Sequence, residues 1–289
     1  MSKRRELKER LAVLDEMEDI VSAMKNMALL EIRKLEVFLA TQRRTVASIE
    51  AAAQDFLSFY PYLQPNTEDL PQLWIVIGSE RGFCGDFNES LLQFLNAKAQ
   101  QTDTLLLAIG RKLETKLHDD KRIATFIQGH SVVEEIQGTL LHLTEVLNQL
   151  QQQLKLAKIG RISAVYFDDE TDTVQLRQLL PLGAPKEKST FSHPPLLNLE
   201  PHQFLSQLTD QYLYASLHEV FYASLMVENH KRLEHMNSAI NHLEKNEIQL
   251  RLSYNKLRQE EIIEEIEIIL LSAEVLTETD KPKQSAVNL

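Results

Sequence analysis

The stretch LEHMNSAINHLEKNEIQLRLSYNKL at 233–257 contains neither glycine nor proline, and its apolar residues recur at steps of three and four. These residues are Leu233, Met236, Ile240, Leu243, Leu250, Tyr254 and Leu257, with an interruption at Glu247. Such spacing places one apolar stripe along a helix and is typical of a coiled-coil seam. The stretch therefore predicts a helix that packs lengthwise on another helix.

Both ends of the chain share this lack of helix-breaking residues. All eight glycines lie between Gly78 and Gly183, and no proline occurs before Pro61 or between Pro201 and Pro282. In a helix interior, glycine costs about 1 kcal/mol and proline about 3 kcal/mol relative to alanine. At about 1.5 Å per residue, continuous helices at the two ends would run roughly 90 and 120 Å.

An apolar stripe also follows the N-terminal segment, with mostly alternating steps of three and four. Its members are Leu7, Leu11, Leu14, Met17, Val21, Met24, Ala28, Leu35 and Phe38. Neither terminal stripe can be buried on its own. We therefore expect the two helices to pair as an antiparallel coiled coil.

Between the two ends, short apolar or alternating stretches indicate β-strands. They are LWIVIGS (73–79), TLLLAIG (104–110), IATFI (123–127), RISAVYFD (161–168) and TVQLRQLL (173–180). Helical stretches near 88–101, 111–118 and 131–157 lie between them. This alternation predicts a small Rossmann-like α/β domain with a partly parallel sheet, whose last two strands form a hairpin across Asp168–Asp172.

The predicted fold class is α/β plus a long coiled coil, with the α/β domain between the antiparallel N- and C-terminal helices. A rod with a globular body suits a protein that spans distance or transmits force. The expected segments are an N-terminal coiled-coil helix (1–60), the α/β domain (72–182), a linker (183–201), a C-terminal coiled-coil helix (202–277) and a polar, disordered tail (278–289).

Composition excludes several classes of protein. The 289 residues carry a net charge of -11, which argues against nucleic acid as the main partner. A single cysteine, Cys84, excludes an internal disulfide and fits a reducing compartment. No apolar run reaches the roughly 18 residues of a membrane span, and the basic start has no apolar signal-peptide core. We expect a soluble chain, or one held at a membrane only by a partner.

Cofactor motifs are missing from the sequence. It contains neither GxxxxGK[ST] nor a strand followed by GxGxxG, so we expect no nucleotide binding by either route. No HxxxH pair occurs, and His230, His235 and His242 lack a metal-ligand spacing. They are interpreted as solvated helix histidines, and no cofactor or metal is predicted.

The most motif-like stretch is GSERGFCGDFNES at 78–90. Cys84, between Gly82 and Gly85, could be a nucleophile if a histidine and a carboxylate converged on it. No signature supplies those partners. The favoured interpretation is a tight, glycine-permitted turn after a strand, ending near Asn88 as a helix cap.

An acidic and isoleucine-rich segment has two interpretations. Its carboxylates are Glu260, Glu261, Glu264, Glu265 and Glu267, and its apolar residues are Ile262, Ile263, Ile266, Ile268, Ile269, Leu270 and Leu271. The carboxylates form either a solvated helix face, which the pattern alone favours, or a charged collar with Arg258 and Gln259 against loops of an enclosing protein. A helix apolar nearly all round is buried or enclosed by a partner.

Three ordered blocks resemble the gamma subunit of the F-type ATP synthases, the central rotor stalk. LKERLAVLDEMEDIVSAMKNMA (7–28) resembles that family's opening helix, and GSERGFCGDFNESL (78–91) is similar to its SDRGLCGGLN signature. LLLAIGRK (105–112) and QLLPL (178–182) follow in the expected order. LRLSYNKLRQEEIIEEIEIILLSAEVL (250–276) resembles the family's ending.

The resemblance implies a non-catalytic subunit that transmits torque during ATP synthesis or ion transport. The terminal helices would lie inside a ring of alpha and beta subunits, and the α/β domain would form a foot near the epsilon subunit and the membrane c-ring. It implies a peripheral protein on the cytoplasmic side of the cell membrane. Matching positions for rotor–hexamer contact or support are Met24, Lys25, Glu228, Arg232, Met236, Tyr254, Asn255, Arg258, Gln259 and Glu265; those of the foot signature are Arg81, Gly82, Cys84, Gly85 and Asn88.

The sequence departs from the family pattern in the last block. Glu260 and Glu261 follow the RQ pair where alanine is usual, Ile263 replaces threonine, Ile268 replaces glutamate and Ser272 replaces glycine. The extra glutamates favour contact with matched partner loops. The divergence as a whole suggests a paralogous rotor, that of the alternate, sodium-type F-ATPase. With one cysteine, the redox switch of chloroplast gamma subunits is not expected.

Two other functions remain open at the level of sequence. A non-rotary coiled-coil scaffold or adaptor with an α/β head fits the helical ends equally well, but it gives no reason for the blocks SERGFCGDFN and YNKLRQ. An α/β enzyme that uses Cys84 depends on that single residue. The ordered blocks favour the rotor subunit.

Overall fold

The computed structural model describes residues 3–64, 71–98, 104–153, 161–183 and 193–279. It divides into two compact units. One comprises Met1–Met24 and Asn237–Leu289, and the other comprises Lys25–Met236.

Two long helices open and close the chain, as the lack of glycine and proline predicts. Helix α1 spans Lys3–Phe59 and helix α5 spans Pro201–Thr279. Pro201 occupies the first position of α5, where its missing N–H costs no intrahelical hydrogen bond. The helix α1 ends just before Pro61, which begins the short 3-10 helix η1 (Pro61–Leu63).

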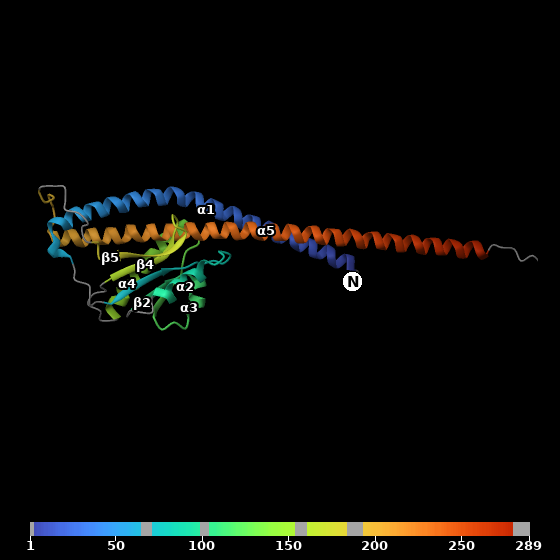
Figure 1. Ribbon diagram of the computed structural model, residues 1–289, viewed down its shortest axis with the longest axis horizontal. Helices are drawn as coiled ribbons and strands as arrows, with labels where there is room; N and C mark the ends of the chain where they lie inside the picture. Colours follow the sequence, from blue (N-terminus) through green and yellow to red (C-terminus); the bar gives the residue numbers. More distant parts are fainter. Residues whose placement is uncertain (1–2, 65–70, 99–103, 154–160, 184–192, 280–289) are drawn as a thin grey trace, which may run out of the picture. The chain divides into compact units, whose positions relative to one another are not determined.

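In the larger unit, α1 and α5 pack against each other in opposite directions. The rings of Phe56 and Phe204 are 4.8 Å apart, and those of Phe38 and Tyr222 are 6.0 Å apart. Residue numbers thus rise along α1 as they fall along α5, and both helices lie along the sheet in Figure 1. The antiparallel arrangement is confirmed.

The smaller unit pairs the beginning of α1 with the later part of α5. The guanidinium of Arg4 lies 2.8 Å from the carboxylate of Glu261. The predicted interruption of the seam, Glu247, is only 18% exposed in its side chain and pairs with Arg251 on the same helix. Glu247 thus occupies a largely buried position in the seam, where its charge is paired with that of Arg251.

The seam of α1 differs from the predicted stripe at two positions. Met17 and Phe38 are 48% and 47% exposed, whereas Leu39 is buried. An antiparallel seam advances by alternating steps of four and three, so the step from Leu14 leads to Glu18 rather than Met17. Glu18 is accordingly the partly buried residue of the two.

The middle of the chain folds into a five-stranded sheet in the order β3-β2-β1-β4-β5. The strands are β1 (Gln72–Ile77), β2 (Thr104–Ile109), β3 (Ile123–Ile127), β4 (Arg161–Asp168) and β5 (Thr173–Leu180). Strands β1 to β4 are parallel, and β5 runs antiparallel to β4 as the predicted hairpin.

Helices cover both faces of this sheet. They are α2 (Phe87–Lys98), α3 (Arg111–Leu117) and α4 (Ile136–Gln153), the last preceded by the 3-10 helix η3 (Val133–Glu135). Along β1, Leu73, Ile75 and Ile77 pack in the cluster with α1, α4 and α5, whereas Trp74 and Val76 pack with α2 and α3. A strand buried on both faces is a continuous apolar run because successive side chains point to opposite faces.

The predicted fold class is confirmed by this mixed sheet between two long helices. The outer parts of the helices expected at 88–101 and 131–157 fall at 99–101 and 154–157, outside the described residues. Most of the predicted linker and tail also lies outside them, so the division into domains stays a prediction. Within the described part of the chain, no helix is both long and apolar enough for a membrane span.

Candidate functional site

The motif-like stretch forms the loop between β1 and α2, as expected for a tight turn. Phe83 and Gly85 have φ values of 64° and 59°. Glycine adopts this left-handed region without strain, but a bulky aromatic residue seldom does. The chain therefore accepts some backbone strain at Phe83 in a loop whose neighbours are held by specific contacts.

The prediction that Asn88 caps the following helix is wrong. Helix α2 begins at Phe87, so Asn88 lies inside its first turn. Its side-chain oxygen accepts a hydrogen bond from the Ser79 N–H at 3.1 Å, and its amide donates to the Ser79 hydroxyl at 2.8 Å. Asn88 thus ties the helix to the end of β1, where the sheet's own hydrogen bonds stop.

Cys84 lacks the features of an activated nucleophile. It is 3% exposed, and its sulfur lies 3.4 Å from the Ser79 hydroxyl oxygen. Burial raises the pKa of the thiol, whereas a reactive cysteine has a lowered pKa and an accessible sulfur. Packing inside the loop is the better account of this residue.

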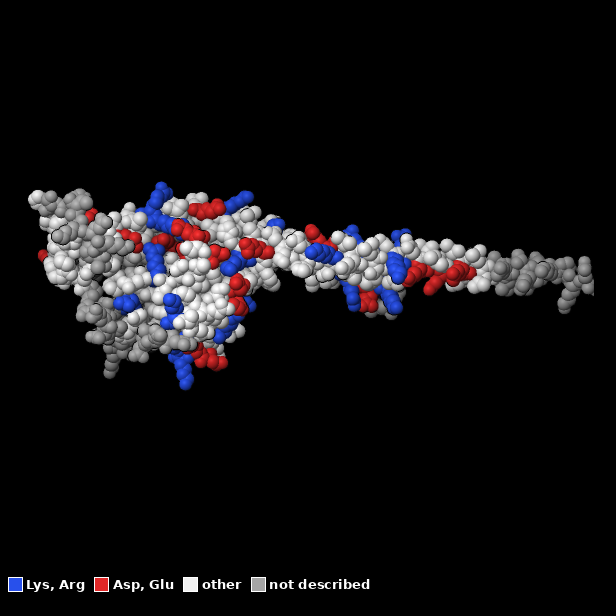
Figure 2. All heavy atoms as spheres, viewed as in Figure 1, with Lys and Arg blue, Asp and Glu red and all other residues white. Residues whose placement is uncertain are grey.

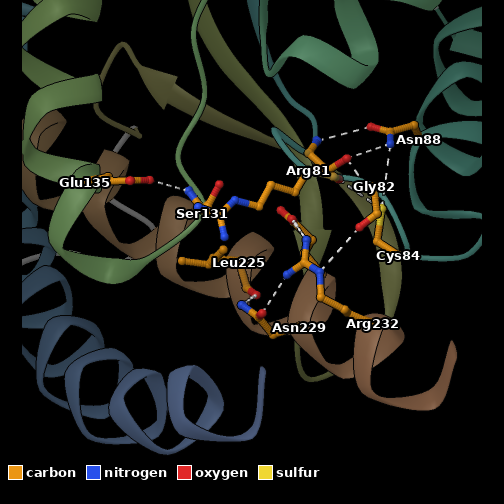
Figure 3. A network of polar contacts seen from close by, with 11 residues as sticks. Arg81, Gly82, Cys84, Asn88, Ser131, Glu135, Leu225, Asn229 and Arg232 are labelled. Atoms are coloured by element: carbon orange, nitrogen blue, oxygen red, sulfur yellow. Dashed lines mark hydrogen bonds and ion pairs between the residues drawn. The ribbon is translucent and has the colours of Figure 1, made fainter. Parts of the chain in front are cut away.

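A cluster of charged and polar groups fastens this loop to α5 (Figure 3). The Arg232 guanidinium donates to the side-chain amide oxygen of Asn229 at 2.7 Å, pairs with Glu228, and reaches the backbone carbonyl of Gly82 at 3.5 Å. Lys231, one residue earlier, pairs with Asp86 of the loop at 2.9 Å. We call Gly82, Asp86, Glu228, Asn229, Lys231 and Arg232 the latch.

The ion pair at the centre of the latch is almost fully buried. Glu228 is 3% exposed and Arg232 is 6% exposed. Burial raises the pKa of Glu228 to about 7, and the nearby Arg232 only partly opposes that shift. A buried pair contributes directional contacts, but each charge depends on its partner because water cannot replace it.

The raised pKa of Glu228 gives the latch a predictable pH dependence. The native state holds a proton on Glu228 that the unfolded state releases above its ordinary pKa of 4.5, so this group's stabilisation is lost as the pH rises towards about 7. The loss amounts to up to about 3 kcal/mol, at about 1.4 kcal/mol per pH unit. Chemical denaturation from pH 4.5 to 8 should show it as a difference between the wild type and Glu228→Gln.

The quantity to measure is the difference in unfolding free energy between the wild type and Glu228→Gln, because buried histidines produce the opposite pH dependence. Burial lowers the pKa of His130 to about 4 and lowers that of His218, which makes stability rise over the same pH range. These contributions cancel when the variant is subtracted. Parallel pH profiles for wild type and variant would contradict the role assigned to Glu228.

The carboxyl ends of the parallel strands are closed by an internal carboxylate. Glu80 accepts hydrogen bonds from the Arg111 N–H at 3.0 Å and the Gly129 N–H at 2.9 Å, and the Arg111 guanidinium lies 2.6 Å from it. Burial alone would raise the pKa of Glu80, but these hydrogen bonds lower it. Doubly wound sheets bind anionic ligands at this edge, and here Glu80 receives the backbone N–H groups instead.

The ten residues predicted for rotor–hexamer contact or support fall into three groups by burial. Glu228, Arg232 and Met236 are buried in the larger unit, where Lys25 is partly exposed. In the smaller unit Met24 and Tyr254 are partly exposed. The exposed residues there are Asn255, Arg258, Gln259 and Glu265. The structure thus brings Glu228 and Arg232 together in the latch, buries Met236 without placing it there, and leaves the exposed residues available.

The residues of the foot signature also differ in burial. Cys84 and Asn88 are buried beside Ser79, Gly82 contacts Arg232 through its carbonyl, and Arg81 and Gly85 are exposed. Sequence reasoning missed Ser79 and Glu80, which stand inside the quoted block at 78–90, and Asn229, which lies outside the quoted blocks. No spacing rule marks Ser79 or Glu80, because their partners Asn88, Arg111 and Gly129 come from other parts of the fold.

The acidic, isoleucine-rich segment is exposed in the smaller unit. Its large apolar side chains range from 44% exposed at Ile262 to 66% at Ile268. Red acidic spheres gather near the end of the described part of α5 in Figure 2. Glu261 pairs with Arg4, so part of the acidic group is engaged within the chain. Exposure of so many isoleucines on one helix is typical of a surface covered by a partner.

The described residues contain no group of three or more His, Cys, Asp or Glu side chains arranged for a metal ion. Fold and latch together define a class of protein in which a Rossmann-like sheet is fixed to two paired long helices. The family model described as ATP synthase matches residues 3–276. The chain belongs to the ATP synthase gamma-chain family.

Relatives of known identity match over nearly their full length. The ATP synthase gamma chain of Azobacteroides pseudotrichonymphae is 24% identical over 288 residues, covering 94% of this chain and 98% of its own. That of Coxiella burnetii is 26% identical over 293 residues, covering 94% and 99%. Both similarities extend through the paired helices and the sheet.

Solved structures share the fold. A chain of the Euglena gracilis mitochondrial ATP synthase, in a structure of its OSCP, F1 and c-ring, aligns with a TM-score of 0.60 at 16% identity and covers 99% of each chain. A chain from the central stalk and c-ring of the Tetrahymena thermophila mitochondrial enzyme gives 0.56 at 18% identity, covering 76% of this chain and 99% of that one.

Proposed function

We propose that this chain is the central-stalk rotor subunit of a membrane-peripheral F1 ATPase or ATP synthase. It transmits torque between an ion-driven membrane ring and a catalytic alpha/beta hexamer, and it carries no catalytic site itself. The observation that carries the proposal is membership of the gamma-chain family across 3–276, which includes both long helices and the sheet. A non-rotary scaffold is not favoured, because it accounts for none of the matched blocks.

The proposed partners follow the two kinds of surface. The exposed end of α5, with its acidic and isoleucine-rich segment, fits enclosure by the alpha and beta subunits. The sheet domain would contact the epsilon subunit and the membrane c-ring, on the cytoplasmic side of the cell membrane. Nucleotide binding is assigned to the hexamer, and Glu80 already takes the N–H groups of Arg111 and Gly129 in this chain.

The exposure of each proposed rotor residue indicates whether it would contact the hexamer or support the shaft from within the chain. Asn255, Arg258, Gln259 and Glu265 are exposed and would contact the hexamer. The buried residues of the latch would support the shaft from the larger unit. Met24, Lys25 and Tyr254 are partly exposed and join the contact group. The unusual glutamates and isoleucines of the last block support assignment to an alternate, sodium-type rotor.

Reconstitution with the alpha and beta subunits tests the proposal. The complex should hydrolyse ATP and rotate a probe attached to the sheet domain of this chain. Arg258→Ala/Gln259→Ala should weaken the coupling of rotation to hydrolysis while leaving the free chain folded, because both side chains are exposed. The matched control is Arg44→Ala/Gln54→Ala, which removes the same two exposed residue types from α1 of the larger unit.

Single-molecule rotation and bulk ATPase rates supply the two readings. A hexamer that hydrolyses ATP while this chain stays fixed, or never binds it, overturns the rotor assignment. An unchanged coupling ratio in the Arg258/Gln259 variant, with normal rotation of the wild type, contradicts only the role of those two residues.

A further inference from the structure

A second polar cluster joins the sheet to both long helices, away from the latch. It comprises Arg43 and Glu50 of α1, Asp169 and Glu170 of the β4–β5 turn, Arg177 of β5, and Tyr212 and Glu219 of α5. We call these residues the clasp. All of them belong to the larger unit.

Helix periodicity aligns the helical members of the clasp. Arg43 and Glu50 on α1 are separated by two turns, as are Tyr212 and Glu219 on α5, so each pair lies on one face of its helix. Because the helices are antiparallel, the Tyr212 hydroxyl donates to Glu50 at 3.0 Å and Arg43 lies 3.9 Å from Glu219. Two rungs thus connect α1 and α5.

The antiparallel hairpin of the sheet inserts its charges between these rungs. Arg177 of β5 lies 2.9 Å from Glu219 on α5 and 3.3 Å from Glu50 on α1. At the turn, Asp169 and Glu170 lie 2.6 and 3.1 Å from the Arg43 guanidinium. Arg43 on α1 therefore contacts both the hairpin and α5. Arg177 on the hairpin contacts both α1 and α5.

Burial and charge make the contacts depend on one another. Side-chain exposure is 13% at Glu219, 14% at Asp169 and 25% at Arg177. Burial raises the pKa of Asp169, and although burial would lower the pKa of Arg177, Glu219 keeps that arginine charged. Two arginines face four carboxylates, so the loss of either arginine leaves carboxylates without a counter-charge.

We propose that the clasp is a second torque-bearing joint between the sheet domain and the helix pair, with Arg43 and Arg177 as its positioning residues. This inference rests on the proposed rotor function. The hydrophobic effect that packs the sheet against the helices is non-directional. Charge-assisted hydrogen bonds have a preferred geometry and resist displacement of one element along another.

Two separated joints along α5 prevent the sheet domain from pivoting about a single point of attachment. The latch holds α5 at Glu228–Arg232, and the clasp holds it at Tyr212–Glu219. From Glu219 to Arg232 the helix rises about 20 Å at about 1.5 Å per residue. A single joint leaves the sheet free to pivot about it, whereas two joints at that spacing convert a turn of the sheet into a turn of the helices.

The first experiment uses the free full-length chain. Spin labels at Gln175→Cys on β5 and Ala47→Cys on α1 report the distance between hairpin and helix, and buried Cys84 with its raised pKa resists labelling. Arg43→Gln/Arg177→Gln should broaden that distance distribution. The matched control, Arg122→Gln, removes an arginine that pairs with Asp120 in the turn before β3 and bridges no helix to the sheet.

The second experiment places the same variants in the complete complex in vesicles. The double variant should hydrolyse ATP at the wild-type rate without a gradient but lose ion pumping against an opposing gradient, where the joint bears load. The single Arg43→Gln variant, which retains the Arg177–Glu219 pair, should lose less and serves if the double variant fails to fold.

The outcomes separate the two claims. Wild-type pumping under load in the double variant, or an equal loss in Arg122→Gln, overturns the clasp while leaving the rotor assignment intact. Failure of the wild-type chain to rotate or pump overturns the rotor assignment and the torque role with it. Broadened distances together with a loss of pumping confined to the clasp variants supports the proposal.

Discussion

At pH 8, above the raised pKa of Glu228, replacing Arg232 with alanine is expected to lower the free energy of unfolding by about 3–5 kcal/mol, because it leaves the buried carboxylate of Glu228 without its partner. Arg232 also donates to the side-chain amide oxygen of Asn229 within α5 and reaches the Gly82 carbonyl of the loop after β1. Its loss therefore frees the loop after β1 as well as unpairing a charge. Urea denaturation of the full chain, monitored by circular dichroism, measures the change.

A matched control uses another arginine on the same helix. Arg251 also pairs with a glutamate one turn away, but its side chain is 65% exposed. Arg251→Ala should cost less than about 1 kcal/mol, because water screens an exposed pair. Equal losses in the two variants would contradict the view that burial sets the importance of Arg232. Replacing Glu228 and Arg232 together by methionine should recover part of the stability.

Replacing Gly110 with alanine is the second change expected to have a large effect. Gly110 has a φ of 103°, and a β-carbon there would lie 2.7 Å from the carbonyl oxygens of both Gly78 and Ser79. Left-handed backbone costs an L-residue about 1–2 kcal/mol and overpacking a further 1–3, so we expect a loss of about 2–5 kcal/mol. The obstructing atoms are backbone and cannot rotate away.

Gly138 provides the control for this substitution. It lies within α4, and a β-carbon added to it meets nothing within 4 Å. Gly138→Ala should raise stability by about 0.5–1 kcal/mol, since alanine loses less backbone entropy in a helix. Thermal unfolding of both variants measures these two opposite changes in stability. A Gly110→Ala protein as stable as the wild type would show that the turn after β2 is not sterically closed.

Periodicity predicted the helices and strands well because each depends on neighbouring residues in the chain. The lack of glycine and proline led to α1 and α5, and the apolar runs led to all five strands. The seam of α1 was predicted less accurately, because Met17 and Phe38 were assigned to it but are exposed. Apolar character marks a candidate for the seam, but the facing helix selects the register.

The candidate site could be predicted only in part. The block at 78–91 stood out as a sequence and Arg232 as a matching position, yet nothing in the sequence indicated that Arg232 binds Gly82. Asn88 looked like a cap because asparagine often caps helices, but the end of β1 offered its side chain another partner in Ser79. Contacts between distant segments decide the role of a polar side chain.

Sequence alone determined that this chain forms two long helices around an α/β middle, because helix and strand formation depend on local spacing and on where glycine and proline occur. Only the tertiary structure decided which polar residues hold those elements together. Glu228 is a buried partner of Arg232, while Glu265 on the same helix is exposed. The two glutamates are chemically identical, and the difference between support and contact arises from what the fold packs against each.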